Sequence, residues 1–383
     1  MSPRIHSKLP RVGTTIFARM SALAAETGAL NLSQGCPDFD APEELREALA
    51  KAVMDGHNQY APLAGLPALR EQLAIQQQLH RCVDCDPDSE ITVVPGATEG
   101  IFCAIMASVQ PGDDVLVLDP SYDSYVPAIE MAGGRAVRVA LRQPDFAVDW
   151  EVVAARLNSR SRMIVINSPH NPTGTMLTDS DLRTLEELAV RHDLLVCSDE
   201  VYEHLTFDSR PHRSVLQYPQ LRERSFAHFS FGKTFSVTGW KTGYCVAPPA
   251  LTAELRKVHQ FVAFVAVTPV QQAVAEFLAQ YPDYPAGLAD FYQRKRDLFC
   301  AALAGSAFSF EPSAGTYFQL LDYSEISRAA DQQLCERWTR EFGVASIPVS
   351  VFYESPPEQH YLRFCFAKSD VTLKQAAEIL CAI

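Results

Sequence analysis

The sequence has no uninterrupted apolar stretch of the roughly 18 residues that a membrane-spanning helix needs. Its first residues, MSPRIHSKLPRVG, also lack the apolar segment of a secretory signal, so we expect a cytoplasmic protein. Positive charge is scarce as well, with 33 Lys and Arg against 46 Asp and Glu and a net charge of -13. Nucleic acids and anionic membranes bind clustered Lys and Arg, so this balance argues against both as partners.

The ten cysteines are scattered and offer little that would bind a metal. Only Cys82 and Cys85 have the C-x-x-C spacing of zinc and redox sites. No second C-x-x-C and no histidine pair accompanies them, so we expect neither a metal nor a redox site.

Size and composition are those of a globular protein with a large core. The 383 residues are 47% apolar, and at about 100–200 residues per domain we expect two or three domains. We divide the chain into an N-terminal arm with part of a small domain (1–45), a large ligand-binding domain (46–275) and a small C-terminal domain (276–383).

Strands alternate with helices between about residues 91 and 246, which is typical of an α/β fold with a mostly parallel sheet between helices. Seven apolar runs are the expected strands; they begin at Ile91, Asp114, Arg135, Met163, Leu194, Ser225 and Thr242. Ligands of such sheets bind beyond the carboxyl ends of the strands. After residue 270 helices lead into a smaller α+β region, with strands expected at 308–310, 317–322 and 361–366.

Residues 230–244, SFGKTFSVTGWKTGY, carry two lysines among three glycines after an apolar strand. Glycine allows close backbone approach to a bound group, and a lysine partly removed from water has a lowered pKa and becomes an amine nucleophile. Lys233 is therefore a candidate nucleophile. A solvated surface lysine is the commoner alternative.

A strand and a helix are joined through Gly96. The N–H groups of Ala97 and Thr98, the Thr98 hydroxyl and the helix dipole together suit a phosphate. Ser230 and Lys241 would add a hydroxyl and a cation if the loops converge. The alternative is an ordinary turn in which Thr98 caps the helix.

Several polar and aromatic residues follow other strands. A buried carboxylate at Asp199 needs a cationic partner, and a protonated pyridine nitrogen would serve. Tyr202 and Asn171 could contact a ring oxygen, and Tyr122 could stack on a flat ring. Taken singly, Asp199 could cap the next helix, Tyr202 and Tyr122 could belong to the core, and Asn171 could belong to an ordinary turn. Arg363, the one charge in the apolar strand LRFCF, suits bidentate capture of a carboxylate or a structural ion pair.

Together these groups meet the requirements of pyridoxal phosphate acting on an amino acid. The chain resembles the class I aminotransferases of pyridoxal phosphate fold type I, and most of all the methionine aminotransferases and the kynurenine or glutamine aminotransferases. The motifs span nearly the whole chain: LSQGCPDF at 32–39, QYAP at 59–62, PGAT at 95–98, HNPTG at 170–174, SDEVY at 198–202, SFGKTF at 230–235, GWK at 239–241 and Arg363.

The resemblance implies a pyridoxal-phosphate-dependent transaminase in which Lys233 forms a Schiff base with the cofactor. It implies that Asp199 pairs with the pyridine nitrogen and that Asn171 and Tyr202 contact the ring oxygen. The residues that would hold the phosphate or stack on the ring are Gly96, Ala97, Thr98, Ser230, Lys241 and Tyr122. The residues that would bind the substrate are Arg363, Asn171, Gly35, Phe17 and Tyr60.

The resemblance also implies a homodimer with shared sites, since Tyr60 in the family reaches the phosphate of the neighbouring subunit. Two positions depart from the family pattern. Lys241 stands where many members have Arg, and Cys36 stands where close relatives carry an aromatic residue.

Methionine is the expected amino donor, followed by aromatic amino acids, kynurenine and glutamine. Ile16, Phe17, Tyr60 and Tyr122 would suit a large, weakly polar side chain, and no second arginine argues for a dicarboxylic substrate. One alternative is a carbon–sulfur β-lyase acting on cystathionine or a cysteine conjugate. Another is a cofactor-binding regulatory domain, which the acidic charge and the missing DNA-binding module disfavour.

Overall fold

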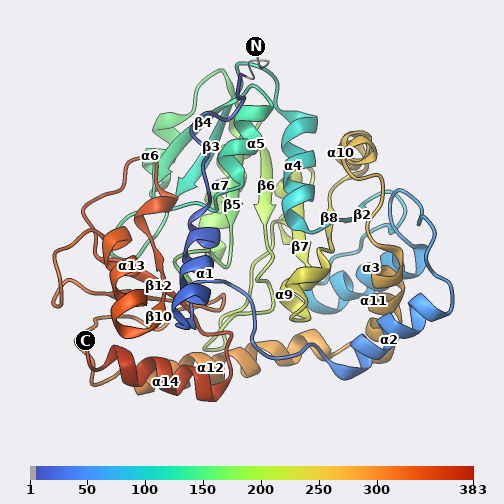
Figure 1. Cartoon of the computed structure of the whole chain (residues 1–383). Coiled ribbons are helices and arrows are strands. Elements are labelled where there is room, and N and C mark those ends of the chain that lie inside the picture. Colours follow the sequence, from blue (N-terminus) through green and yellow to red (C-terminus); the bar gives the residue numbers. More distant parts are fainter. Residues whose placement is uncertain (1–5) are drawn as a thin grey trace, which may run out of the picture.

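The computed structural model describes residues 6–383, and its central feature is a seven-stranded sheet (Figure 1). The strand order is β2-β8-β7-β6-β5-β3-β4. The strands are β2 (Ile91–Val94), β3 (Asp114–Asp119), β4 (Arg135–Ala140), β5 (Ser161–Asn167), β6 (Leu195–Asp199), β7 (Ser225–Ser230) and β8 (Gly243–Val246). Of these, β8 alone runs antiparallel to its neighbours. The predicted α/β fold with a mostly parallel sheet is therefore confirmed.

Helices cover both faces of this sheet, because alternate residues of each strand point to opposite sides and both sides are apolar. In β3, Val115 and Val117 pack into one core while Leu116 and Leu118 pack into another. The first core includes residues of α4 (Ala97–Ser108), α5 (Tyr125–Met131) and α10 (Pro249–Val262). The second includes residues of α2 (Glu43–Met54), α3 (Pro67–Arg81), α6 (Trp150–Arg156), α7 (Asp179–Arg191) and α11 (Thr268–Gln280).

A third core joins the beginning of the described chain to its end. Strand β1 (Leu30–Asn31) pairs in parallel with β10 (Val344–Ala345). A three-stranded antiparallel sheet follows the order β11-β12-β9, with β9 (Phe318–Asp322), β11 (Ile347–Pro348) and β12 (Tyr361–Cys365). The helices in this core are α1 (Ile16–Thr27), α12 (Leu288–Ala302), α13 (Asp331–Phe342) and α14 (Asp370–Leu380). The division into 1–45, 46–275 and 276–383 stays a prediction.

Short helices complete the structure: α8 (Pro219–Arg222), α9 (Phe231–Thr234), η1 (Val215–Gln217), η2 (Thr238–Trp240), η3 (Tyr284–Gly287) and η4 (Ser350–Phe352), the last four being 3₁₀ turns. Helix α9 carries Lys233 directly after β7. In the described part of the chain, no helix has the length and apolar character needed to cross a membrane.

The strand expected at 308–310 is wrong. Ser309 forms a single bridge with Asp322, and at the next position the Gln319 side chain donates to the carbonyls of Glu311 and Leu320 where strand pairing would continue. The elements that were not predicted include α6, α10, β10 and β11, and the short helices α8 and α9 were not predicted either. Helix α10 has a proline in its first turn, a start signal that the sequence does offer.

Candidate active site

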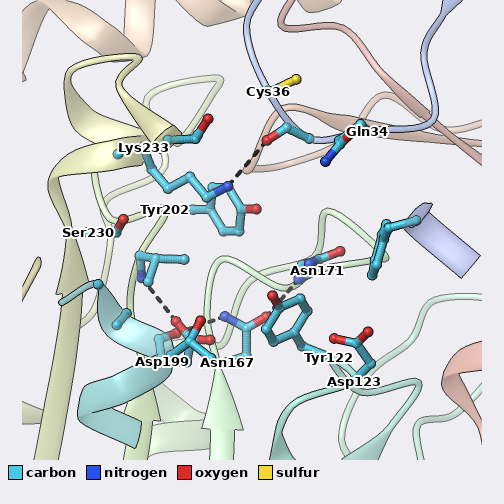
Figure 2. A pocket seen from close by; sticks show the side chains of 18 of the residues that line it. Gln34, Cys36, Tyr122, Asp123, Asn167, Asn171, Asp199, Tyr202, Ser230 and Lys233 are labelled. Atoms are coloured by element: carbon cyan, nitrogen blue, oxygen red, sulfur yellow. Dashed lines mark hydrogen bonds between the residues drawn. The ribbon is translucent and has the colours of Figure 1, made fainter. Parts of the chain in front are cut away.

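A cavity of ≈ 620 Å³ lies at the carboxyl ends of the central strands. Its walls come from the loops after β2, β3, β5, β6 and β7, from α1, and from Phe318 and Arg363 of the three-stranded sheet. Figure 2 shows Lys233 and Asp199 on opposite sides of this space, with Tyr202 near the lysine amine and Tyr122 and Asn171 lower in the view. Most of the predicted site residues therefore converge on one cavity.

The turn between β2 and α4 presents free backbone donors to the cavity. Gly96 is the N-cap of α4 with φ of +80°, a left-handed conformation that favours glycine. Because the N-cap is Gly96 and Thr98 lies inside the first turn with no side-chain cap bond, the alternative that Thr98 caps the helix is wrong. The N–H groups of Ala97 and Thr98 lie in the first turn, where the helix has no internal acceptors for them and carries its positive dipole end.

The loop that carries Lys241 converges on the turn after β2 because β8 runs antiparallel between β2 and β7. Gly243 pairs with both Val94 and Ser230, so Lys241 comes to the same edge of the sheet. The packing is close, since a Cβ added at Gly243 would lie 3.2 Å from the Ala97 nitrogen. A Cβ added at Gly96 would lie 3.3 Å from Lys241 Nζ, which places the cation over the turn.

Lys233 extends from α9 into the cavity. Its Nζ donates to the Tyr317 hydroxyl at 2.7 Å and to the Gly35 carbonyl at 3.3 Å. Burial is the main cause that lowers its pKa to about 8, because it disfavours the ammonium form. A buried amine with such a pKa is a usable nucleophile and base near neutral pH.

Asp199 is the last residue of β6, and its side chain is 5% exposed. Tyr125 Oη donates to Asp199 Oδ2 at 2.5 Å, and Val201 N donates to Oδ1 at 3.4 Å. Burial raises the pKa of Asp199 to about 6, and these two hydrogen bonds oppose that rise. No Lys, Arg or His among residues 6–383 forms a salt bridge with this carboxylate, so it is suited to a cationic ligand group.

Three further predicted residues line the cavity: Tyr122, Asn171 and Tyr202. The Oδ1 atom of Asn171 accepts from Arg363 at 2.6 Å, so its amide nitrogen remains as the donor toward the cavity. Burial raises the pKa of Tyr122 to about 12 and that of Tyr202 further, so both phenols stay protonated at neutral pH. Each can therefore donate a hydrogen bond to a ligand oxygen.

Arg363 is 1% exposed and lies among aromatic rings, with its Cζ 3.8 Å from the Phe318 ring centroid and 5.3 Å from that of Phe17. Its Nη atoms donate to Asn171 and to the Ser33 carbonyl, while its Nε has no partner in the described structure. Within residues 6–383 no acidic side chain pairs with it, so the predicted alternative of a structural ion pair is wrong. A buried, uncompensated guanidinium is suited to a carboxylate ligand.

Only some of the residues predicted to contact the substrate line the cavity. Phe17, Gly35 and Cys36 line the cavity. Ile16 does not, because it packs into the core formed by α1 and the C-terminal elements. Tyr60 does not line it either; it is 80% exposed and packs edge-on against Phe264.

The family follows from a match over most of the chain. Residues 27–380 match the family model described as aminotransferase class I and II. The chain belongs to this family. It is an enzyme that transfers an amino group between an amino acid and a 2-oxo acid, and members of the family depend on pyridoxal phosphate.

Curated relatives and solved structures match the aminotransferase over nearly its whole length. It is 50% identical to a methionine aminotransferase of Escherichia coli (strain K12), over 98% of this chain and 97% of the relative. It is 33% identical to a kynurenine–oxoglutarate transaminase of Dictyostelium discoideum, over 96% and 94%. The solved structure of an Escherichia coli methionine aminotransferase superposes with a TM-score of 0.98, 49% identity and full coverage of both chains.

Among the residues of the aminotransferase site that were not singled out from the sequence, three make hydrogen bonds to predicted ones. Tyr125 contacts Asp199, and Tyr317 contacts Lys233. Asn167 lines the cavity and ties two loops together, because its Nδ2 donates to the Asp199 carbonyl and its Oδ1 accepts from Asn171 N. Tyr125 and Tyr317 resemble ordinary core tyrosines in the sequence, while Asn167 ends a predicted strand at the ligand-binding edge and could have been selected on that ground.

Among the described residues, one group has metal-ligand chemistry, formed by Glu99, Cys103 and His259. Glu99 Oε1 already accepts hydrogen bonds from Cys103 Sγ at 3.0 Å and from His259 Nδ1 at 2.8 Å. These contacts satisfy the facing atoms and join α10 to the first turns of α4. Cys82 and Cys85 are both free, with Cys82 exposed at the end of α3.

Proposed function

We propose that this aminotransferase binds pyridoxal phosphate in the cavity and prefers L-methionine as its amino donor. Aromatic amino acids, kynurenine and glutamine are the further candidates. The observation that carries the substrate assignment is Arg363, the only arginine lining the cavity in the described structure. One guanidinium binds the α-carboxylate, which leaves no second one for an acidic side chain.

The cavity fits the cofactor at both ends. The phosphate would lie at the first turn of α4, where a Cβ at Gly96 would crowd the Lys241 amine at 3.3 Å. Ser230 and Thr98 line the same region and supply hydroxyls. At the other end, buried Asp199 has no cationic partner among residues 6–383, and a pyridinium nitrogen would neutralise it.

Pyridoxal phosphate, when bound, supplies an aldehyde for covalent attachment and a ring that withdraws electrons from the substrate α-carbon. Lys233 Nζ would be the amine that holds the cofactor, and when free it would take up the substrate α-proton as a base and return it as an acid. Asp199 would pair with a protonated ring nitrogen. Arg363 fixes the carboxylate and thereby orients the bond that breaks, which supplies much of the rate.

We also propose a cytoplasmic homodimer in which Tyr60 reaches the partner's phosphate site. Support comes from the exposed aromatic pair of Tyr60 and Phe264, which are 80% and 44% exposed, and from Phe261 near the end of α10, which is 85% exposed. Exposed aromatic residues gathered in one place are typical of protein interfaces.

A half-reaction screen tests the substrate assignment. The absorbance of the bound cofactor is followed after addition of single amino acids, including methionine, phenylalanine, kynurenine, glutamine and aspartate. Methionine should react with the highest second-order rate constant and aspartate with one of the lowest. Faster reaction with aspartate than with methionine would overturn the preference, and reaction with none would overturn the catalytic assignment. Release of pyruvate and ammonia from cystathionine without a 2-oxo acid would instead identify a β-lyase.

A further inference from the structure

Tyr317 and the Gly35 carbonyl form a small polar site around the amine of Lys233. Tyr317 Oη lies 2.7 Å from Lys233 Nζ and 2.5 Å from the Gly35 oxygen, which is itself 3.3 Å from Nζ. The three groups come from α9, from the residue before β9 and from the turn after β1. Figure 2 shows the Lys233 amine joined to this carbonyl.

The number of hydrogens on each group determines which of them donates and which accepts in these hydrogen bonds. A phenol has one hydrogen, and Tyr317 gives it to the Gly35 oxygen. Burial raises the pKa of Tyr317 well above its ordinary value, so the phenol keeps that hydrogen. Toward Lys233 the phenol oxygen is therefore an acceptor only. Two neutral acceptors hold N–H groups of the amine, and no described residue donates to its lone pair.

Packing holds the phenol in place. Tyr317 is fully buried, and its ring lies edge-on to Tyr202 and Phe318 with centroids 5.2 and 4.9 Å apart. The preceding residue, Thr316, has φ of +68°, a left-handed conformation that is unusual for a β-branched residue. Such a conformation is unfavourable and persists where surrounding structure imposes it, which is commonest at functional sites. This strained residue directly precedes the tyrosine that contacts the lysine.

We propose that Tyr317, with the Gly35 carbonyl, is the holding site for the Lys233 amine whenever that amine is not joined to the cofactor. This inference rests on the proposed function, in which substrate displaces Lys233 and the freed amine then moves the α-proton. An amine held by its N–H groups keeps its lone pair for the incoming proton. Tyr317 is thus a positioning residue, and Gly35 couples the amine to the loop that lines the substrate side of the cavity.

The test compares Tyr317→Phe with a matched control, Tyr292→Phe. Tyr292 is also fully buried and its ring lies 6.0 Å from that of Tyr317, but its hydroxyl contacts Ser236. In the full chain freed of cofactor, the pKa of Lys233 is measured by competitive acetylation across pH, read at the Lys233 peptide by mass spectrometry. Loss of an acceptor destabilises the ammonium form, so Tyr317→Phe should lower this pKa by about half a unit to one unit while Tyr292→Phe leaves it unchanged.

In the holoenzyme, Tyr317→Phe should lower kcat by roughly 10- to 100-fold and leave KM within about twofold of the wild-type value. The kinetic isotope effect on kcat with α-deuterated substrate should increase. If Tyr317→Phe and Tyr292→Phe had the same Lys233 pKa and the same kcat, the holding site would be overturned.

If Tyr317→Phe does not fold, 3-fluorotyrosine is placed at position 317, because it keeps the hydroxyl but makes its oxygen a weaker hydrogen-bond acceptor. It should lower the Lys233 pKa by a smaller amount, and an unchanged value would again overturn the inference. The pKa measurement needs no turnover, so it separates failure of the holding site from failure of the proposed function.

Discussion

The phenol of Tyr125 donates to Asp199 Oδ2 at 2.5 Å, inside the core between α5 and the central sheet. This bond opposes the burial that raises the pKa of Asp199 to about 6. It thus helps keep the carboxylate charged at neutral pH, the form that a pyridinium nitrogen requires.

Replacing Tyr125 with phenylalanine should therefore weaken cofactor binding. A hydrogen bond to a charged group is worth about 1.5–3 kcal/mol, so the dissociation constant of pyridoxal phosphate should rise by roughly 10- to 100-fold at pH 7. Because the pKa of Asp199 rises further, the acidic limit of cofactor binding should move to higher pH. Absorbance titrations between pH 5 and 9 measure both effects.

The matched control is Tyr218→Phe, which removes a tyrosine–aspartate hydrogen bond far from the cavity, between Tyr218 and Asp179. It should leave cofactor affinity and its pH dependence unchanged. An unchanged pH limit in Tyr125→Phe would contradict the role assigned to the Tyr125–Asp199 bond.

The cofactor-free chain should become more stable when Asp199 is replaced with asparagine. Burial raises the pKa of Asp199 from 3.8 to about 6, so the folded chain holds a proton between these pH values that the unfolded chain has lost. Stability therefore falls as pH rises from 4 to 6, and above 6 the charged form costs up to about 3 kcal/mol. At pH 7.5 the free energy of unfolding, measured in urea, should be higher for Asp199→Asn than for the wild-type chain.

This gain should shrink as pH falls toward 4, where folded and unfolded Asp199 are both largely protonated. Asp179→Asn is a control of opposite sign, because hydrogen bonds from Tyr218 and Arg183 lower the pKa of Asp179 in the folded chain. A less stable Asp199→Asn chain at pH 7.5 would show that the site is already neutralised without a ligand.

The sequence predicted those parts of the fold and site that depend on local chemistry. Strand patterns placed Asp199 and Lys233 at the carboxyl ends of buried strands, and the glycines of two loops indicated the proposed phosphate site. Contacts between distant segments could not be predicted from spacing: residues 35, 233 and 317 meet only because β9 and the turn after β1 fold over α9. Likewise, nothing local distinguishes Tyr125 or Tyr317 from a core tyrosine.

Replacing Lys233 with alanine should abolish turnover while pyridoxal phosphate stays bound without a covalent link. The phosphate cradle and Asp199 do not involve this side chain, whereas the attachment and the proton transfer do. Borohydride reduction followed by mass spectrometry should give a cofactor adduct in the wild-type enzyme and none in Lys233→Ala. Normal activity of the variant would contradict the assignment of Lys233.

Arg363→Lys tests the carboxylate clamp, since it keeps the positive charge and removes the planar fork. The kcat/KM for methionine should fall by roughly 10²- to 10³-fold, because two charge-assisted hydrogen bonds are replaced by one point charge. Cofactor affinity should stay within a few fold, because Arg363 lies on the substrate side. Equal loss of cofactor binding would mean that the arginine supports the whole cavity and does not hold the substrate.

Mixing two inactive variants tests whether Tyr60 acts across a dimer interface. Tyr60 is 80% exposed and lies outside the cavity of its own chain. If it serves the partner's site, a heterodimer of Lys233→Ala and Tyr60→Ala contains one site with an intact lysine and an intact tyrosine. Random exchange of subunits should then restore about a quarter of the wild-type activity, since half of the dimers are mixed and each has one complete site. Each variant alone, treated in the same way, is the control. If Tyr60 instead acts within its own chain, every site in the mixture lacks either the lysine or the tyrosine. A mixture with no more activity than the sum of its parts would therefore contradict the assignment of Tyr60 to the partner's site.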